Sequence, residues 1–257
     1  SIGNAGTGSV MSLNGVSNLS IQNLNFERTA APTAAQFLLV GDNCSNITVA
    51  ANTFNGFPGS TSTNNNLVRF NNSQSISIVQ NQLRNGNIGY QSNASVANQP
   101  NFAHNVSSNL FENLNGTAIL FDGTGGSSQA IVEGNTISNL TVTPSTTADG
   151  ISFSLLNNTV IRRNLITGGI GRYGIHLNNY NGSASSPNLV VNNVVSGLFA
   201  STTANAFRLT SVGSALADRD YARVINNSFN LRTSTSSTTA NGVVFITGGT
   251  ASAPTAN

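Results

Sequence analysis

Short apolar alternations, each interrupted by asparagine, recur along the chain. In residues 128–140, SQAIVEGNTISNL, alternating apolar residues stop at Gly134 and Asn135 and then resume. The same pattern, apolar-x-apolar-x-x-Asn-x-apolar, returns at intervals of 26 to 34 residues by subtraction of residue numbers. An earlier copy carries Leu24 in place of the asparagine. The asparagines at this position are Asn52, Asn81, Asn109, Asn135, Asn164, Asn193 and Asn227.

Two columns of this repeat are apolar in every copy. The position three before the asparagine is β-branched, as in Val132, and the position two after it is apolar and often aromatic, as in Phe111. A further alternating segment precedes most copies, as in residues 67–72 and 151–156. Repeats of about 28 residues with one inward residue per column predict a solenoid, because each coil buries its face against the next. We therefore expect one all-β domain over residues 1–257, with eight to nine coils of three short strands.

The repeated asparagine predicts a tight corner between the second and third strand of each coil. A corner residue often adopts the left-handed backbone region, which asparagine tolerates best after glycine. Asparagines stacked about 4.8 Å apart in successive coils can also hydrogen-bond to one another. The pattern therefore predicts an internal asparagine ladder, with the asparagine itself as the corner residue.

This combination resembles the right-handed parallel β-helix of the pectate lyase-like superfamily, whose coils carry such a ladder. The resemblance covers nearly the whole chain and is closest to repeat segments of large bacterial surface and adhesin proteins. It implies an architecture more strongly than an activity, because lyases, hydrolases, tailspikes and adhesins share the fold. The chain starts within a coil and ends without a recognisable cap, so we expect a segment of a longer protein.

Composition restricts the possible functions. Charged residues make up only 7% of the chain, lysine is absent, and ten arginines face eight acids. The pI near 9.1 therefore reflects a small imbalance and predicts no nucleic-acid surface. Cys44 is the single cysteine, and no zinc-type spacing occurs, so we expect no metal and no cofactor. No apolar run approaches a membrane span of about 20 residues, and the polar Asn, Ser and Thr surface favours an extracellular or cell-surface location.

The strand that precedes each repeat unit supplies the candidate binding face. Alternation predicts that one set of side chains points outward from this strand in successive coils. Asp149 and Arg172 are expected in the loops that enter these strands. The candidate ligand-binding residues are Arg69, Asp122, His176, Asn178 and Arg208.

If the chain is an enzyme, the candidate catalytic residues are Asp122, Asp149, His176 and Arg208. Cleavage of a glycosidic bond requires two carboxylates about 5 to 10 Å apart, and no outward row contains acids on adjacent coils. The only close acidic pair, Asp218 and Asp220, falls in a long loop and is expected to keep it solvated.

These observations favour a non-enzymatic β-helical stalk or adhesin that contacts glycans or neighbouring surface proteins. The alternatives are a polysaccharide lyase or glycoside hydrolase acting on the same face, and a phage tailspike-like binding module. Carboxylates within catalytic range beside His176 would favour the enzyme.

Overall fold

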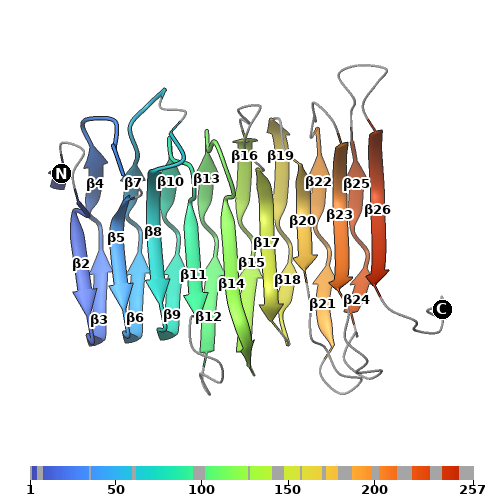
Figure 1. Ribbon diagram of the computed structural model, residues 1–257, viewed down its shortest axis with the longest axis horizontal. Coiled ribbons are helices and arrows are strands. Elements are labelled where there is room, and N and C mark those ends of the chain that lie inside the picture. Colours follow the sequence, from blue (N-terminus) through green and yellow to red (C-terminus); the bar gives the residue numbers. More distant parts are fainter. Residues whose placement is uncertain are drawn as a thin grey trace.

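The chain forms a parallel β-solenoid without helices in the computed structural model, over the residues that it describes. Strands stack along the long axis in chain order, as the colours of Figure 1 show. The described residues are 2–4, 8–34, 36–59, 62–94, 102–126, 128–140, 148–156, 158–169, 172–178, 187–197, 203–212, 222–231 and 239–248.

Three parallel sheets run along the solenoid, and consecutive members of each sheet are three strands apart in the chain. Sheet A contains β1 (Ile2–Asn4), β4 (Asn25–Arg28), β7 (Thr53–Asn55), β10 (Gln82–Arg84), β13 (Leu110–Glu112), β16 (Thr136–Leu140), β19 (Leu165–Gly169), β22 (Val194–Ser196) and β25 (Ser228–Asn230). Sheet B contains β2 (Met11–Asn14), β5 (Gln36–Asp42), β8 (Asn65–Asn71), β11 (Tyr90–Ala94), β14 (Ile119–Gly126), β17 (Asp149–Leu156), β20 (Tyr173–Asn178), β23 (Thr203–Val212) and β26 (Thr239–Gly248). Sheet C contains β3 (Ser17–Gln22), β6 (Ser45–Ala50), β9 (Gln74–Val79), β12 (Phe102–Ser107), β15 (Ser128–Glu133), β18 (Val160–Arg162), β21 (Asn188–Val191) and β24 (Ala222–Ile225).

The two apolar columns of the repeat line the interior, as the sequence predicts. Val132 pairs in register with Val106 and Ile161, and all three are buried. The column after the asparagine behaves in the same way, and Phe26 stacks on Phe54 with ring centroids 4.7 Å apart. In both columns the residues of the last copy, Val224 and Phe229, are only partly buried. The two inward columns thus form one continuous core across neighbouring coils.

One residue at an inward position of sheet B is exposed. Val243 lies on β26 in register with the buried Phe207, yet 43% of its surface is accessible. The strand β26 has a paired strand on one side only in the described part of sheet B, so less apolar surface covers it.

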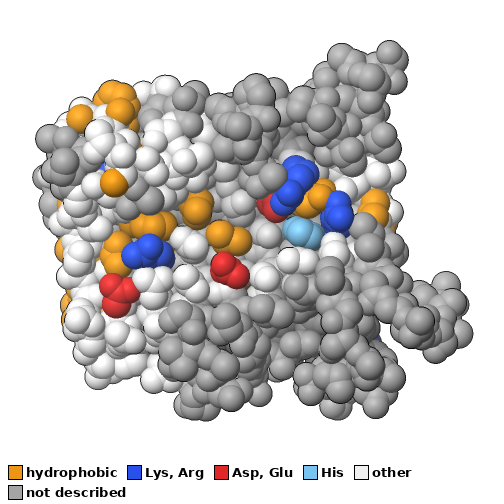
Figure 2. Space-filling view, viewed as in Figure 1, with side chains coloured by type: hydrophobic (Ala, Val, Ile, Leu, Met, Phe, Trp, Pro, Cys, Tyr) orange, Lys and Arg blue, Asp and Glu red, His pale blue; other side chains and the backbone are white. Residues whose placement is uncertain are grey.

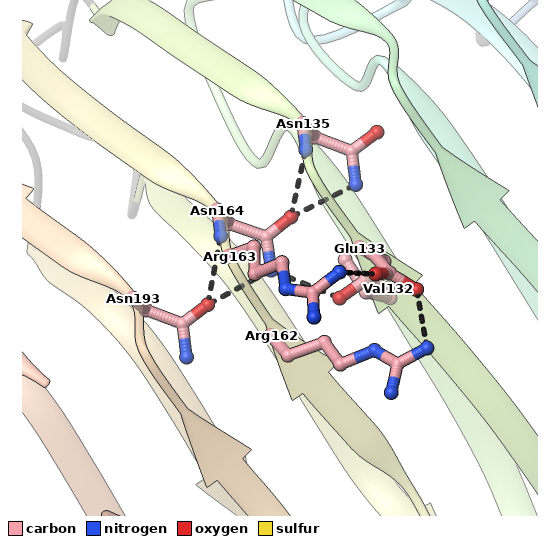
Figure 3. A network of polar contacts seen from close by, with 7 residues as sticks. All are labelled: Val132, Glu133, Asn135, Arg162, Arg163, Asn164 and Asn193. Carbon is pink, nitrogen blue, oxygen red and sulfur yellow. Dashed lines mark hydrogen bonds and ion pairs between the residues drawn. The ribbon is translucent and has the colours of Figure 1, made fainter. Parts of the chain in front are cut away.

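The asparagine ladder is confirmed at the corner between sheets C and A. Asn135 donates from its backbone N and its Nδ2 to Oδ1 of Asn164, at 3.0 and 2.9 Å. Asn164 bonds in the same two ways to Asn193, and its Nδ2 also donates to the carbonyl of Val132 (Figure 3). The amide of Asn164 therefore satisfies two backbone groups of the preceding coil and is linked to the next coil through the Asn193 side chain.

The prediction that the ladder asparagine itself adopts the left-handed backbone conformation is wrong. The left-handed residue at each corner is instead the one before it, with φ of 54° at Ala51, 57° at Gln80, 63° at Gly134 and 58° at Arg163. Several residue types occupy this position, because its side chain points away from the core. Asparagine is needed at the ladder position for its amide, which both donates and accepts hydrogen bonds.

Candidate carbohydrate-binding face

One register row of outward side chains crosses sheet B. Strand pairing aligns six residues from β8 to β23 in this row: Arg69, Gln91, Leu120, Ser152, His176 and Arg208. A second outward row, two residues further along each strand, contains Asp122, Ser154, Asn178 and Thr210. The alternation of the sequence predicted both rows except for Gln91 of β11.

A third outward row forms because two successive residues face the interior at the start of these strands. A Cβ on Gly150 would lie 2.9 Å from Ile166 Cδ1, and one on Gly174 would lie 2.5 Å from Val195 Cγ1, so both glycines face the core. The next residue, such as Ile151, is buried as well. This local irregularity turns the residue before each glycine outward, and the paired strands share it without a shift of register. Asp149 and Tyr173 consequently share the outer face with His176.

An ion pair anchors the middle of the face. Arg172 reaches Asp149 with both Nε and Nη2, at 3.3 and 3.2 Å. His176 Nδ1 lies 3.7 Å from Asp149 Oδ2. Asp149 is only 3% exposed, so this pair is less screened by solvent than a surface salt bridge. The carboxylate of Asp149 is therefore already engaged by two cationic or protonatable neighbours.

Tyr173 connects Arg172 and Arg208, and these three residues form one cluster with Asp149 and His176. The guanidinium carbons of Arg172 and Arg208 lie 4.2 and 4.9 Å from the centroid of its ring, within the range of cation–π interactions. Arg208 Nη1 also donates to the Tyr173 hydroxyl, and its Nε donates to Thr210 Oγ1 at 3.1 Å. The His176 ring is 4.6 Å from the Tyr173 ring. These contacts hold Arg208 in a fixed orientation.

The cluster carries one excess positive charge. Two arginines and one aspartate give +1 when His176 is neutral. Arg172 pairs with Asp149, whereas Arg208 has no carboxylate partner among the residues that the structure describes. Figure 2 shows this gathering of basic, acidic and histidine side chains on the face, apart from the other charged side chains. The arrangement is suited to binding an anion at Arg208.

The structure brings together three of the four candidate catalytic residues: Asp149, His176 and Arg208. Asp122 lies elsewhere, because it pairs with Ser154, five residues beyond Asp149. At about 3.3 Å per residue, this places Asp122 roughly 17 Å from Asp149 along the strand direction. Asn178 lies on β20 two residues beyond His176, and Arg69 lies at the far end of the row.

Tyr173 was missed by the sequence analysis. Strict alternation along β20 would place Tyr173 on the same side as Ile175, which is buried. The signal for the irregularity is a small residue before the first inward apolar residue, as in Gly150-Ile151, Gly174-Ile175 and Ala206-Phe207.

No group of three His, Cys, Asp or Glu residues that could hold a metal ion occurs within the described ranges. Asp218 and Asp220 lie outside these ranges. In the same part of the chain, no helix has the length and hydropathy to cross a membrane.

A second polar arrangement lies inside the solenoid. His104 of β12 occupies an inward column that holds Ile76 in the preceding strand of sheet C. Its Nε2 lies 2.9 Å from the Ser73 carbonyl and its Nδ1 2.7 Å from the Tyr90 hydroxyl. Because a carbonyl only accepts, Nε2 carries the proton and Tyr90 donates to Nδ1. Burial lowers the pKa of His104 from 6.5 to about 4, against the opposing effect of the Ser73 bond, and raises the pKa of Tyr90.

We expect His104 to make the fold sensitive to acid. A lowered pKa in the folded state means that the unfolded chain binds the proton first, so the free energy of unfolding falls as the pH drops from 6.5 to 4. The loss reaches about 3 kcal/mol at most and should be absent above pH 7. Urea denaturation at a series of pH values measures it. His104→Gln, which does not titrate, should remove this slope, and an unchanged slope in the variant would contradict the assignment.

The described fold and face define a parallel β-helix with a cationic cluster on one sheet. Neither protein-family models nor curated proteins match the sequence.

Proposed function

We propose that the chain is a non-enzymatic β-helical segment of an extracellular surface protein, and that sheet B binds acidic carbohydrate. The observation that carries this proposal is Arg208, a guanidinium held by Tyr173 and Thr210 with no carboxylate partner among the described residues. The parallel β-solenoid architecture of the chain supports a relationship to the pectate lyase-like superfamily and to its adhesin segments. The low charge and the Asn, Ser and Thr surface support an extracellular location, where glycans and neighbouring surface proteins are available partners.

Arg208 is suited to recognise a sugar carboxylate. A guanidinium can donate two parallel hydrogen bonds to a carboxylate, which gives both strength and orientation. The bonds to Tyr173 and Thr210 fix the side chain before the ligand arrives, so little rotamer entropy is lost on binding. His176 and Ser152 follow in the same register row and offer hydrogen bonds to sugar hydroxyls.

The arrangement of acids supports binding without hydrolysis. Retaining and inverting glycosidases need two carboxyl groups about 5 to 10 Å apart. Asp149 is the single acid in the described cluster, and it is buried and paired with Arg172. Asp122, roughly 17 Å away along the strand direction by register, is too distant to act with it.

A polysaccharide lyase is the second candidate, and a specific contact favours it. Eliminative cleavage of a uronic acid chain requires a cation near the sugar carboxylate and a base for the adjacent proton. Arg208 is such a cation, and the Tyr173 hydroxyl and His176 ring stand beside it. The test of function must therefore monitor products as well as binding.

The proposal predicts that Arg208→Gln weakens the binding of acidic oligosaccharides roughly ten- to hundredfold, as expected for loss of a charged hydrogen bond. Calorimetric titration measures the affinity, with neutral oligosaccharides as a ligand control. Arg223→Gln serves as the matched control, because Arg223 is exposed on β24 of sheet C. Equal affinity of the parent and Arg208→Gln would contradict the site. New reducing ends or unsaturated uronate products in the parent, lost in Arg208→Gln, would replace the binding proposal by the enzyme.

A further inference from the structure

A second arginine on sheet B stacks on an aromatic ring. The guanidinium carbon of Arg69, on β8, lies 4.6 Å from the centroid of the Phe37 ring, on β5. Its Nε is buried without a hydrogen-bond partner. No acid within the described residues forms an ion pair with Arg69. Arg69 is thus a second cation on this face without a compensating carboxylate.

The two arginine–aromatic pairs occupy equivalent positions in the repeat. Phe37 is in register with Asn66, and Arg69 follows Asn66 by three residues. Tyr173 is in register with Asn205, and Arg208 follows Asn205 by three residues. In both pairs the ring belongs to one coil and the arginine to the next coil, with ring distances of 4.6 and 4.9 Å. The solenoid therefore builds the same cationic element twice on one sheet.

One straight row connects the two elements. Five strand pairings separate β8 from β23, and Arg69 and Arg208 occupy the same register row. At about 4.8 Å per strand, the two α-carbons are about 24 Å apart. The residues between them in the row are Gln91, Leu120, Ser152 and His176. None of these four side chains is acidic, and the acids Asp42 and Asp122 lie in the neighbouring outward row, two residues further along their strands.

We propose that Arg69 and Arg208 are two anion subsites of one surface, and that its ligand is a linear uronate polysaccharide lying along the solenoid axis, across the strands. This inference rests on the proposed function and assigns the ligand's direction and minimum length. A flexible chain with carboxylates on successive sugars can reach both cations, whereas a short oligomer reaches one. Once the first subsite is occupied, the second carboxylate binds at high effective concentration.

A chain-length series of uronate oligosaccharides tests this inference by calorimetry. For the parent, affinity should rise tenfold or more at the length that spans about 24 Å. Arg69→Gln should abolish this step, while the shortest oligomers that bind should still bind at Arg208. Arg69→Lys, which keeps the charge without the planar stacking group, should retain part of the step. Arg223→Gln is again the matched control, and thermal melts verify that each variant is folded.

The outcomes separate the two proposals. If long oligomers bind the parent and Arg69→Gln equally well, with binding still lost in Arg208→Gln, the two-subsite surface is wrong and the Arg208 site stands. If no uronate oligomer of any length binds the parent, the proposed function itself fails. A gain with sulfated oligomers but not with uronates would show that the subsites select sulfate and would overturn the uronate assignment.

Discussion

Val132→Asp should unfold the protein or reduce its free energy of unfolding by about 5 kcal/mol. Val132 is fully buried in the inward column of sheet C, between Val106 and Ile161. A carboxylate at this position would lose its hydration without gaining a partner, and the neighbouring coils supply only apolar side chains. Substitutions of this kind belong to the small class with effects above 4 kcal/mol. Chemical denaturation monitored by circular dichroism gives the value.

Ile131→Asp is the matched control for this prediction. Ile131 precedes Val132 on β15, faces outward and is 36% exposed. The same carboxylate there should change stability by about 1 kcal/mol or less, because it stays in contact with water. Val132→Thr supplies a milder probe that should still fold, with a loss of about 1 to 3 kcal/mol from the buried hydroxyl. Equal stability of the two aspartate variants would show that the inward column is assigned wrongly.

Asn164→Ala should destabilise the fold by about 2 to 5 kcal/mol. Oδ1 of Asn164 accepts from the backbone N and Nδ2 of Asn135, and its Nδ2 donates to the Val132 carbonyl and to Asn193. Alanine leaves at least the Asn135 N–H and the Val132 carbonyl buried without these partners. Each such group costs about 1 to 3 kcal/mol. Equilibrium denaturation in urea measures the change.

Asn25→Ala provides the comparison for the ladder. Asn25 is exposed on β4, directly after Leu24, so its removal should shift stability by less than about 0.5 kcal/mol. The contrast isolates the buried amide from a general effect of replacing asparagine. A loss below 1 kcal/mol for Asn164→Ala would contradict the energetic role assigned to the ladder.

The fold was largely predictable because a solenoid repeats its inward positions. Residues such as Val132 and Phe111 keep the same spacing to the asparagine in each copy, which identifies strands, corners and core together. Three strands of sheet B were not identified, namely β2, β5 and β11. β5 has a run of buried residues without alternation, and β11 carries a buried Ser92 where other coils have an apolar residue. Strict alternation fails in β5 and β11 because the interior tolerates other patterns.

The binding face was predictable only in part. Period-two alternation placed His176 and Arg208 in the correct outward row. It missed Tyr173, because Gly174 and Ile175 both face inward and reverse the alternation at this point. The ion pair between Asp149 and Arg172 joins residues of adjacent coils, and its geometry depends on this irregularity. Such a local break in the alternation has only a weak sequence signal.

His104 shows a different limit. It stands in a column that contains Ile76 in the neighbouring coil, and sequence alone does not show whether a histidine there turns inward. Its acceptance in the core depends on Tyr90, which comes from sheet B and supplies the proton for Nδ1. This partnership crosses the interior between two sheets. It therefore depends on tertiary structure that the repeat pattern does not specify.

Mapping a bound uronate oligosaccharide by nuclear magnetic resonance tests the central claim most directly. Amide signals of the isotopically labelled protein would be followed during titration. The account predicts that shifts concentrate on β17, β20 and β23, around Asp149, Tyr173, His176 and Arg208, and that the oligosaccharide stays intact. Shifts confined to the outer surfaces of sheets A and C, or no shifts at saturating oligosaccharide, would contradict the claim that sheet B binds acidic carbohydrate.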